Sequence, residues 1–169
     1  MFLLKEIPDK KDIKTAVGDD RNIDPSSVSS VFCILKASSD MLVEVEKFFT
    51  EKNLSLSRYN ALSILSSHSE GLFPYELADH MGISRATASS VIKGLESSGY
   101  VGAVKSGEDR RMKKITATKD GIAVYESSVS QFYTLLTQLF GTHNKKDVKI
   151  VNTAMKSISE RVQNYKNNS

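Results

Sequence analysis

The sequence contains few of the residues that mark a secreted, membrane-spanning or irregular protein. Its 169 residues include one cysteine, three prolines and no tryptophan. A single cysteine excludes an internal disulfide, so we expect a reducing, cytoplasmic compartment. No run approaches the roughly 18 apolar residues of a membrane helix, and the apolar start ends at Lys5, too early for a signal peptide. These absences predict a soluble protein with no membrane partner, rich in helix and poor in irregular loops.

The chain as a whole has no large excess of positive or negative charge, but one segment has a clear excess of positive charge. The formal net charge is only +3, whereas residues 84–119 hold eight basic and three acidic side chains. A positive segment of this kind is typical of a surface that binds a polyanion, with a solvated charged hairpin as the alternative. The basic residues are Arg85, Lys93, Lys105, Arg110, Arg111, Lys113, Lys114 and Lys119.

Hydrophobic spacing and helix-end signals predict an N-terminal arm followed by long helices. Residues 1–24 show little periodicity, so we expect partial order at best, with a short helix or strand packed on a partner chain. Asp24 is a suitable N-cap for a helix that has Pro25 at its first position, and the apolar spacing predicts that this helix continues to about residue 52. Further helices are predicted over residues 55–71, 118–141 and 145–165.

The middle of the chain predicts a helix-turn-helix followed by a hairpin. One short helix should begin at Pro74 and end at Gly82, and a second should begin after Ser84 and end at Gly99. Residues 100–105 and 112–116 are extended stretches around a polar tip, which predicts a β-hairpin. The apolar stripe expected on the buried side of the second helix is Ala88, Val91, Ile92 and Leu95.

The order of these elements resembles the MarR family of winged-helix transcriptional regulators, over about residues 28–165. The stretches that carry the resemblance are ELADHMGIS, TASSVIKGLESSGYV and GEDRRMKKITATKDG. The family's wing has an Asp-x-Arg signature, followed by a Thr and a Gly at the start of the next helix. Asp109 and Arg111 match the first part, and Thr118 and Gly121 match the second.

The resemblance implies a fold that is mainly α with a small β-hairpin wing. It consists of a winged helix-turn-helix DNA-binding domain over residues 55–118 and a helical dimerisation layer from residues 25–54 and 119–169. The apolar faces of the first and the last two helices exceed what one small winged helix can cover, so we expect a homodimer. Such a dimer would bind a pseudo-palindromic site in double-stranded DNA.

The second helix of the helix-turn-helix is the expected recognition helix. Its first turns should enter the major groove, where Arg85 could bond a guanine edge and hydroxyl groups could bond bases or phosphates. The alternative is that the small polar residues only fill a solvent-exposed face. The candidate DNA-binding residues here are Ser84, Arg85, Thr87, Ser89, Ser90 and Lys93.

The wing supplies the remaining candidates for DNA contact. Arg110 or Arg111 could reach the minor groove, and the resemblance assigns this contact to Arg111, held in place by Asp109. A salt bridge at the hairpin tip is the alternative. Lys113 completes the predicted set. Gly94 is unusual inside a helix, and we expect it to permit close helix packing or close approach of the DNA backbone.

The single cysteine and the three histidines do not form a recognisable site. One branch of the family senses organic peroxides through a cysteine early in its first helix, but Cys33 lies about two residues from that position. We predict that Cys33 is a small, buried, structural residue, with redox sensing as the alternative. The histidines lack metal-ligand spacing, and no nucleophile has a base nearby. We therefore expect neither a metal, a cofactor nor an enzymatic activity.

The resemblance also implies a repressor whose DNA binding is relieved by a small phenolic or aromatic effector. The family's ligand cleft lies between the first, second and fifth helices, and ordinary packing is the alternative role for the residues that would line it. These residues are Arg58, Tyr59, His68 and Phe73. A different hypothesis is a SarA-like architectural or accessory factor that binds DNA or protein without an effector.

Overall fold

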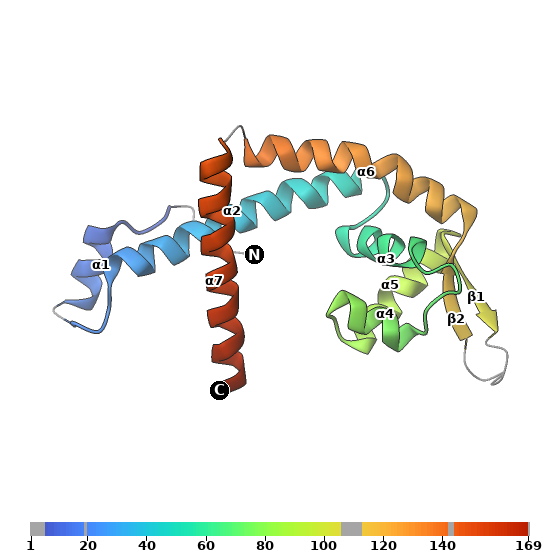
Figure 1. The fold of residues 1–169 in the computed structure, drawn as a ribbon, viewed down its shortest axis with the longest axis horizontal. Helices are drawn as coiled ribbons and strands as arrows, with labels where there is room; N and C mark the ends of the chain where they lie inside the picture. The colour runs from blue at the N-terminus through green and yellow to red at the C-terminus, as the bar shows by residue number, and fades with distance from the viewer. Residues whose placement is uncertain (1–5, 19, 106–112, 142–143, 169) are drawn as a thin grey trace. The chain divides into compact units, whose positions relative to one another are not determined.

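The structure, a computed structural model, describes residues 6–18, 20–105, 113–141 and 144–168. Within these ranges it has long helices, a compact group of shorter helices and one antiparallel hairpin (Figure 1). The chain forms two compact units, Met1–Ser130 and Gln131–Ser169, which are described separately. The predicted class, mainly α with a small β-hairpin wing, is confirmed.

The elements follow the predicted order, with one additional helix near the N-terminus. The hairpin pairs Val101 with Ala117 and Lys105 with Lys113. The elements are α1 (Lys10–Val17), α2 (Pro25–Thr50), α3 (Leu56–Ser66), α4 (Pro74–Met81), α5 (Arg85–Ser97), β1 (Val101–Lys105), β2 (Lys113–Ala117), α6 (Lys119–Phe140) and α7 (Lys145–Asn168).

The N-terminal arm contains a well-formed helix. The side chain of Asp9 accepts hydrogen bonds from the backbone of Lys11 and Asp12, at 2.7 and 2.8 Å, and the Asp12 side chain accepts one from the Asp9 backbone. This reciprocal capping satisfies donors at the helix start. Ile13 is buried and α1 packs against α2. The arm therefore packs on its own chain, whereas the sequence suggested a partner chain.

The predicted start of α2 is confirmed. Asp24 caps the helix and Pro25 is its first residue. The Ser27 hydroxyl donates to the Asp24 carboxylate at 2.6 Å, and the backbone N–H groups of Ser26 and Ser27 also donate to it. These bonds favour the charged form, with the Ser27 hydroxyl contributing most, and they lower the pKa of Asp24 below its usual value.

The prediction that Cys33 is buried is wrong. Its side chain is exposed, on a part of α2 where Val31 and Leu35 are exposed as well. Only Val45 and Phe49 are buried in this helix. Large apolar side chains along the rest of α2, such as Leu42 at 53% exposed, also remain accessible to solvent.

The winged helix-turn-helix has a continuous apolar core. Its fully buried side chains include Leu62 and Leu65 of α3, Leu77 of α4 and Leu95 of α5. The predicted buried stripe of α5 is confirmed at all four positions. A bridge between Leu72 and Ile115, with backbone bonds of 3.0 and 2.7 Å, joins the segment before α4 to the wing.

Gly121 allows the start of α6 to approach the end of the recognition helix. A Cβ atom built at this position would clash with the backbone carbonyl of Tyr100. Thr118 holds the same junction, because its hydroxyl donates to the Gly99 carbonyl at 2.8 Å and accepts from the Gly121 N–H at 3.1 Å. The Thr and Gly noted in the sequence therefore hold the wing and α6 together.

The second unit is dominated by α7, which has no buried residue. Several large apolar residues recur on one side of this helix, each more than a third exposed. They are Val151, Met155, Ile158 and Val162. None of the helices within the described residues is long and apolar enough to cross a membrane.

Candidate nucleic-acid interface

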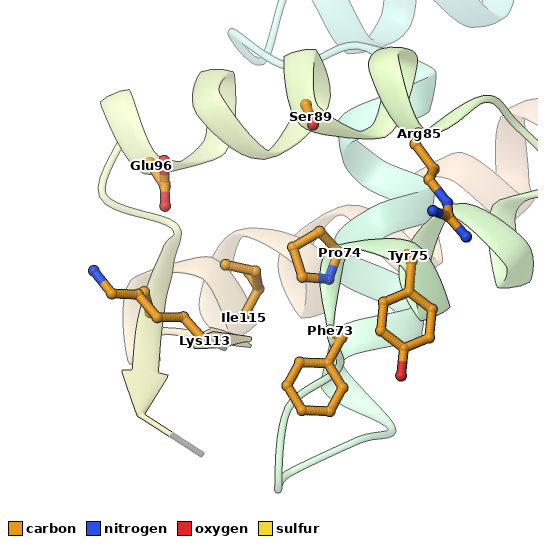
Figure 2. A pocket seen from close by; sticks show the side chains of 9 residues that line it. Phe73, Pro74, Tyr75, Arg85, Ser89, Glu96, Lys113 and Ile115 are labelled. Atoms are coloured by element: carbon orange, nitrogen blue, oxygen red, sulfur yellow. The ribbon is translucent and has the colours of Figure 1, made fainter. Parts of the chain in front are cut away.

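A cleft lies between α5, the first residues of α4 and strand β2 (Figure 2). We call it the α5–wing cleft; its volume is about 530 Å³. It has both cationic and apolar walls, which suits a ligand with charged and apolar parts. Its lining residues are Phe73, Pro74, Tyr75, Arg85, Ser89, Glu96, Ala103, Lys113 and Ile115.

The N-terminus of α5 is fixed by its cap. The Ser84 side chain accepts a hydrogen bond from the Thr87 N–H at 3.1 Å, and the hydroxyl groups of the two residues lie 2.8 Å apart. This arrangement leaves Arg85 exposed on the first turn. Ala88 and Ile92 anchor the opposite side of the helix in the core. Ser84 and Thr87 therefore position the helix, and their hydroxyl groups already bond each other.

Two aromatic rings line the floor of the cleft beside Arg85. Phe73 and Tyr75 are stacked, with ring centroids 5.6 Å apart and planes 8° from parallel. The guanidinium carbon of Arg85 lies 6.0 Å from the Tyr75 ring centroid, and the ammonium of Lys114 lies 5.6 Å from that of Phe73. Cations at such distances are attracted to the ring faces. The aromatic pair therefore holds one cation from α5 and one from β2.

The two ends of the cleft differ in charge. Arg85 lies above Tyr75 at one end, while Glu96 lies near Lys113 at the other (Figure 2). Glu96 offsets the charge of Lys113 at its end, whereas Arg85 has no carboxylate beside it among the lining residues, so the end at Arg85 attracts a polyanion more strongly.

The structure brings together some of the predicted DNA-binding residues. Arg85, Ser89 and Lys113 line the same cleft, and Ser90 and Lys93 are exposed on α5. Asp109, Arg110 and Arg111 lie outside the described residues. Sequence reasoning missed Tyr75, although the Phe-Pro-Tyr stretch before the helix-turn-helix was a usable signal for an aromatic surface.

Neither the α5–wing cleft nor the cavity between α3 and α4 is lined by all four predicted effector residues. Phe73 lines the α5–wing cleft. Tyr59 is buried between the rings of Phe49 and Tyr125, at 4.7 and 5.4 Å, which is a packing role. His68 donates from Nδ1 to the Ile64 carbonyl at 2.7 Å, and Arg58 lies against α5. An effector site formed by these four residues stays a prediction.

A second cavity and the histidines offer little additional chemistry. The second cavity, of about 340 Å³, is lined by parts of α3 and α4 and by Ile83, and contains none of the four predicted effector residues. The rings of His68 and His80 lie 5.1 Å apart. Over the ranges that the structure describes, no group of three potential metal ligands is present.

The chain's relatives identify the domain that this cleft belongs to. The sequence model of the MarR family matches residues 52–112, from the end of α2 to the wing. The chain carries a MarR-family winged helix. This match confirms the resemblance stated from the sequence. Relatives of the chain are named helix-turn-helix transcriptional repressors or regulators.

Similarity extends beyond the matched domain. The transcriptional repressor YetL of Bacillus subtilis is 24% identical, over 96% of this chain and 98% of YetL. Among solved structures, the Staphylococcus aureus MepR–DNA complex has a TM-score of 0.68 at 18% identity, covering 79% of this chain and 96% of MepR. CouR of Rhodococcus jostii, bound to p-coumaroyl-CoA, has a TM-score of 0.63 at 22% identity, covering 75% and 89%. The fold shared with these structures extends beyond the matched residues 52–112.

Proposed function

We propose that this MarR-family protein is a homodimeric, cytoplasmic repressor that binds a pseudo-palindromic operator in double-stranded DNA. The observation that carries the proposal is the α5–wing cleft, which Arg85, Ser89 and Lys113 all line, beside a helix with a buried apolar stripe. The relatives support the repressor role and the DNA ligand, since one is named a repressor and another was solved with DNA.

In this proposal the exposed side of α5 enters the major groove. Arg85, Ser89, Ser90 and Lys93 meet base edges or flanking phosphates, while Lys113 meets the backbone next to the wing. Arg111 enters the minor groove with Asp109 holding it, as the family resemblance implies. Ser84 and Thr87 cap α5, and whichever of their two hydroxyl groups accepts in their mutual hydrogen bond keeps its proton to donate to a phosphate.

The dimer would be built from the long helices. The exposed apolar side chains of α2 and α7 are the surfaces that a second copy would cover. The dimerisation region assigned to residues 25–54 and 119–169 remains our proposal for these helices. Pairing would place two recognition helices for two half-sites.

A small aromatic effector would relieve binding in this proposal. CouR was solved with p-coumaroyl-CoA, which supports an aromatic ligand for this chain as well. The second candidate is an accessory factor with no effector. It is supported by the packing of Tyr59 between the rings of Phe49 and Tyr125, which gives this predicted effector residue a role in the core.

Binding of the purified protein to genomic DNA tests the proposal. Footprinting should recover a duplex with two half-sites about one helical turn apart, bound at least a thousandfold more tightly than scrambled duplex at fixed salt. Equal affinity for both duplexes would favour the accessory factor.

The wing is tested by one further variant. Arg111→Ala should weaken binding to both the footprinted and the scrambled duplex and lower the salt slope by about one. The footprinted and scrambled duplexes are compared at two salt concentrations. Unchanged affinity for both would remove the wing from the mechanism.

A further inference from the structure

The side chain of Arg58 crosses from α3 to the recognition helix. Its guanidinium lies over Gly94 of α5, where a side chain would normally project. A Cβ atom built at Gly94 would lie 2.7 Å from both Cζ and Nε of Arg58, much closer than atoms of folded proteins approach. The missing side chain at Gly94 therefore makes room for a cation at the surface of α5.

This contact explains a glycine that is unfavourable in a helix. Glycine lowers helix stability relative to alanine, so its presence inside α5 calls for a compensating role. At Gly121 the obstacle to a side chain is a backbone carbonyl, which cannot move. At Gly94 the obstacle is the charged end of a flexible side chain, so a side chain at this position would move the cation away and the glycine leaves it room.

Arg58 has no counter-ion within the described part of the chain. Its residue is half-buried, and among the described residues no carboxylate lies within ion-pair distance and no hydrogen bond to its guanidinium is found. A partly desolvated cation without an anion is costly unless a ligand supplies the anion. The recognition helix provides the position where a DNA phosphate would arrive.

The position of Gly94 on α5 indicates which phosphate this would be. Five residues, or about 140° of helix rotation, separate Gly94 from Ser89 in the α5–wing cleft. The two positions thus lie on different flanks of α5. A helix in the major groove has a phosphate backbone on each flank, one from each strand. The α5–wing cleft can contact the phosphate backbone of one strand. The Arg58 guanidinium over Gly94 would lie beside the backbone of the other strand.

We propose that Arg58 binds a backbone phosphate on the flank of α5 opposite the α5–wing cleft, and that Gly94 holds the guanidinium there. The inference rests on the proposed DNA-binding function and adds a second phosphate site to it. The planar guanidinium presents paired donors that match phosphate oxygens. This contact positions the recognition helix and does not depend on base sequence.

Two variants remove the contact in different ways. Arg58→Ala deletes the cation, and Gly94→Ala displaces it while raising the helix propensity of α5. We expect each to weaken binding about tenfold on both the footprinted and the scrambled duplex. The salt slope of Arg58→Ala should fall by about one. The melting temperature of Gly94→Ala should be unchanged or higher. The double variant should bind no more weakly than Arg58→Ala alone, because both changes remove one contact.

Controls separate this inference from the proposed function. Arg21→Ala removes one positive charge from the loop between α1 and α2 and should bind like the wild type. Wild-type affinity in Gly94→Ala, or a loss confined to the footprinted duplex, would overturn the phosphate role of Arg58 and leave the proposed function intact. A lowered melting temperature in Arg58→Ala together with wild-type binding in Gly94→Ala would assign Arg58 to packing. Failure of the wild type to bind either duplex would overturn both proposals.

Discussion

The winged helix and the long helices bury their apolar residues to very different extents. In the winged helix, Leu62, Leu77 and Leu95 are completely buried. In α2 and α7, residues of the same kind are largely accessible, with Leu42 53% exposed and Ile158 38% exposed. The winged helix therefore has a complete core within one chain. The long helices have apolar faces that one chain leaves uncovered, which is why we assign folding to the first region and association to the second.

Two leucine-to-alanine substitutions, one in each region, should give the largest difference in the free energy of unfolding. Leu77→Ala should lower the free energy of unfolding by about 2–5 kcal/mol, because the cavity forms in a closed core. Leu42→Ala should change it by less than about 0.5 kcal/mol at protein concentrations too low for association. Urea unfolding at several protein concentrations makes the comparison. Equal losses at the lowest concentration would show that α2 is as well packed as the winged helix.

A charge placed on α7 tests the association surface. Ile158→Glu should convert a micromolar dimer into a monomer of 18.7 kDa while the winged helix stays folded. Sedimentation and circular dichroism follow the two properties. Thr153→Glu, on the opposite side of α7, should remain dimeric. A wild-type protein that sediments as a stable monomer at micromolar concentration would reject the dimer.

Arg85 and Tyr75 test the cleft in the winged helix. Arg85→Ala should cost about 1–3 kcal/mol on the footprinted duplex and much less on scrambled DNA, if its guanidinium bonds a guanine. Tyr75→Leu should show part of this loss because the ring orients the guanidinium, whereas Tyr75→Phe should retain binding. A double-mutant cycle between the two positions measures their coupling. Additive losses would separate Tyr75 from Arg85.

The smallest expected effect concerns the cap of α2. The lowered pKa of Asp24 in the folded protein means that its charged form stabilises the helix start. This contribution should be fully present above the usual pKa of an aspartate, and it should be lost as pH falls through the lowered value. Melting temperatures over an acid pH series should show this loss in the wild type. The loss should be absent in Asp24→Asn, which keeps a capping side chain without the charge.

The sequence predicted the helix ends well, because they depend on local chemistry. Asp24 and Ser84 act through hydrogen bonds to residues two to three positions away, so their roles follow from spacing alone. The buried side of α5 also followed from its periodicity. These features need no knowledge of the rest of the fold.

Positions that depend on distant segments could not be predicted in the same way. The exposure of Cys33 depends on which elements pack against α2. The contact of Arg58 with Gly94 depends on how α3 packs on α5. The position of Arg85 over the Tyr75 ring likewise needs the turn between α4 and α5.

The bridge between Leu72 and Ile115 has a consequence for the order of folding. Its two backbone bonds enclose α4, α5 and strand β1 in one chain loop. Closing a long loop costs conformational entropy before the contacts at its ends form, so contacts of this kind tend to appear late. The helices can form locally at an earlier stage. The α5–wing cleft requires the closed loop, so amide protons of Leu72 and Ile115 should gain protection from hydrogen exchange only when this surface is complete.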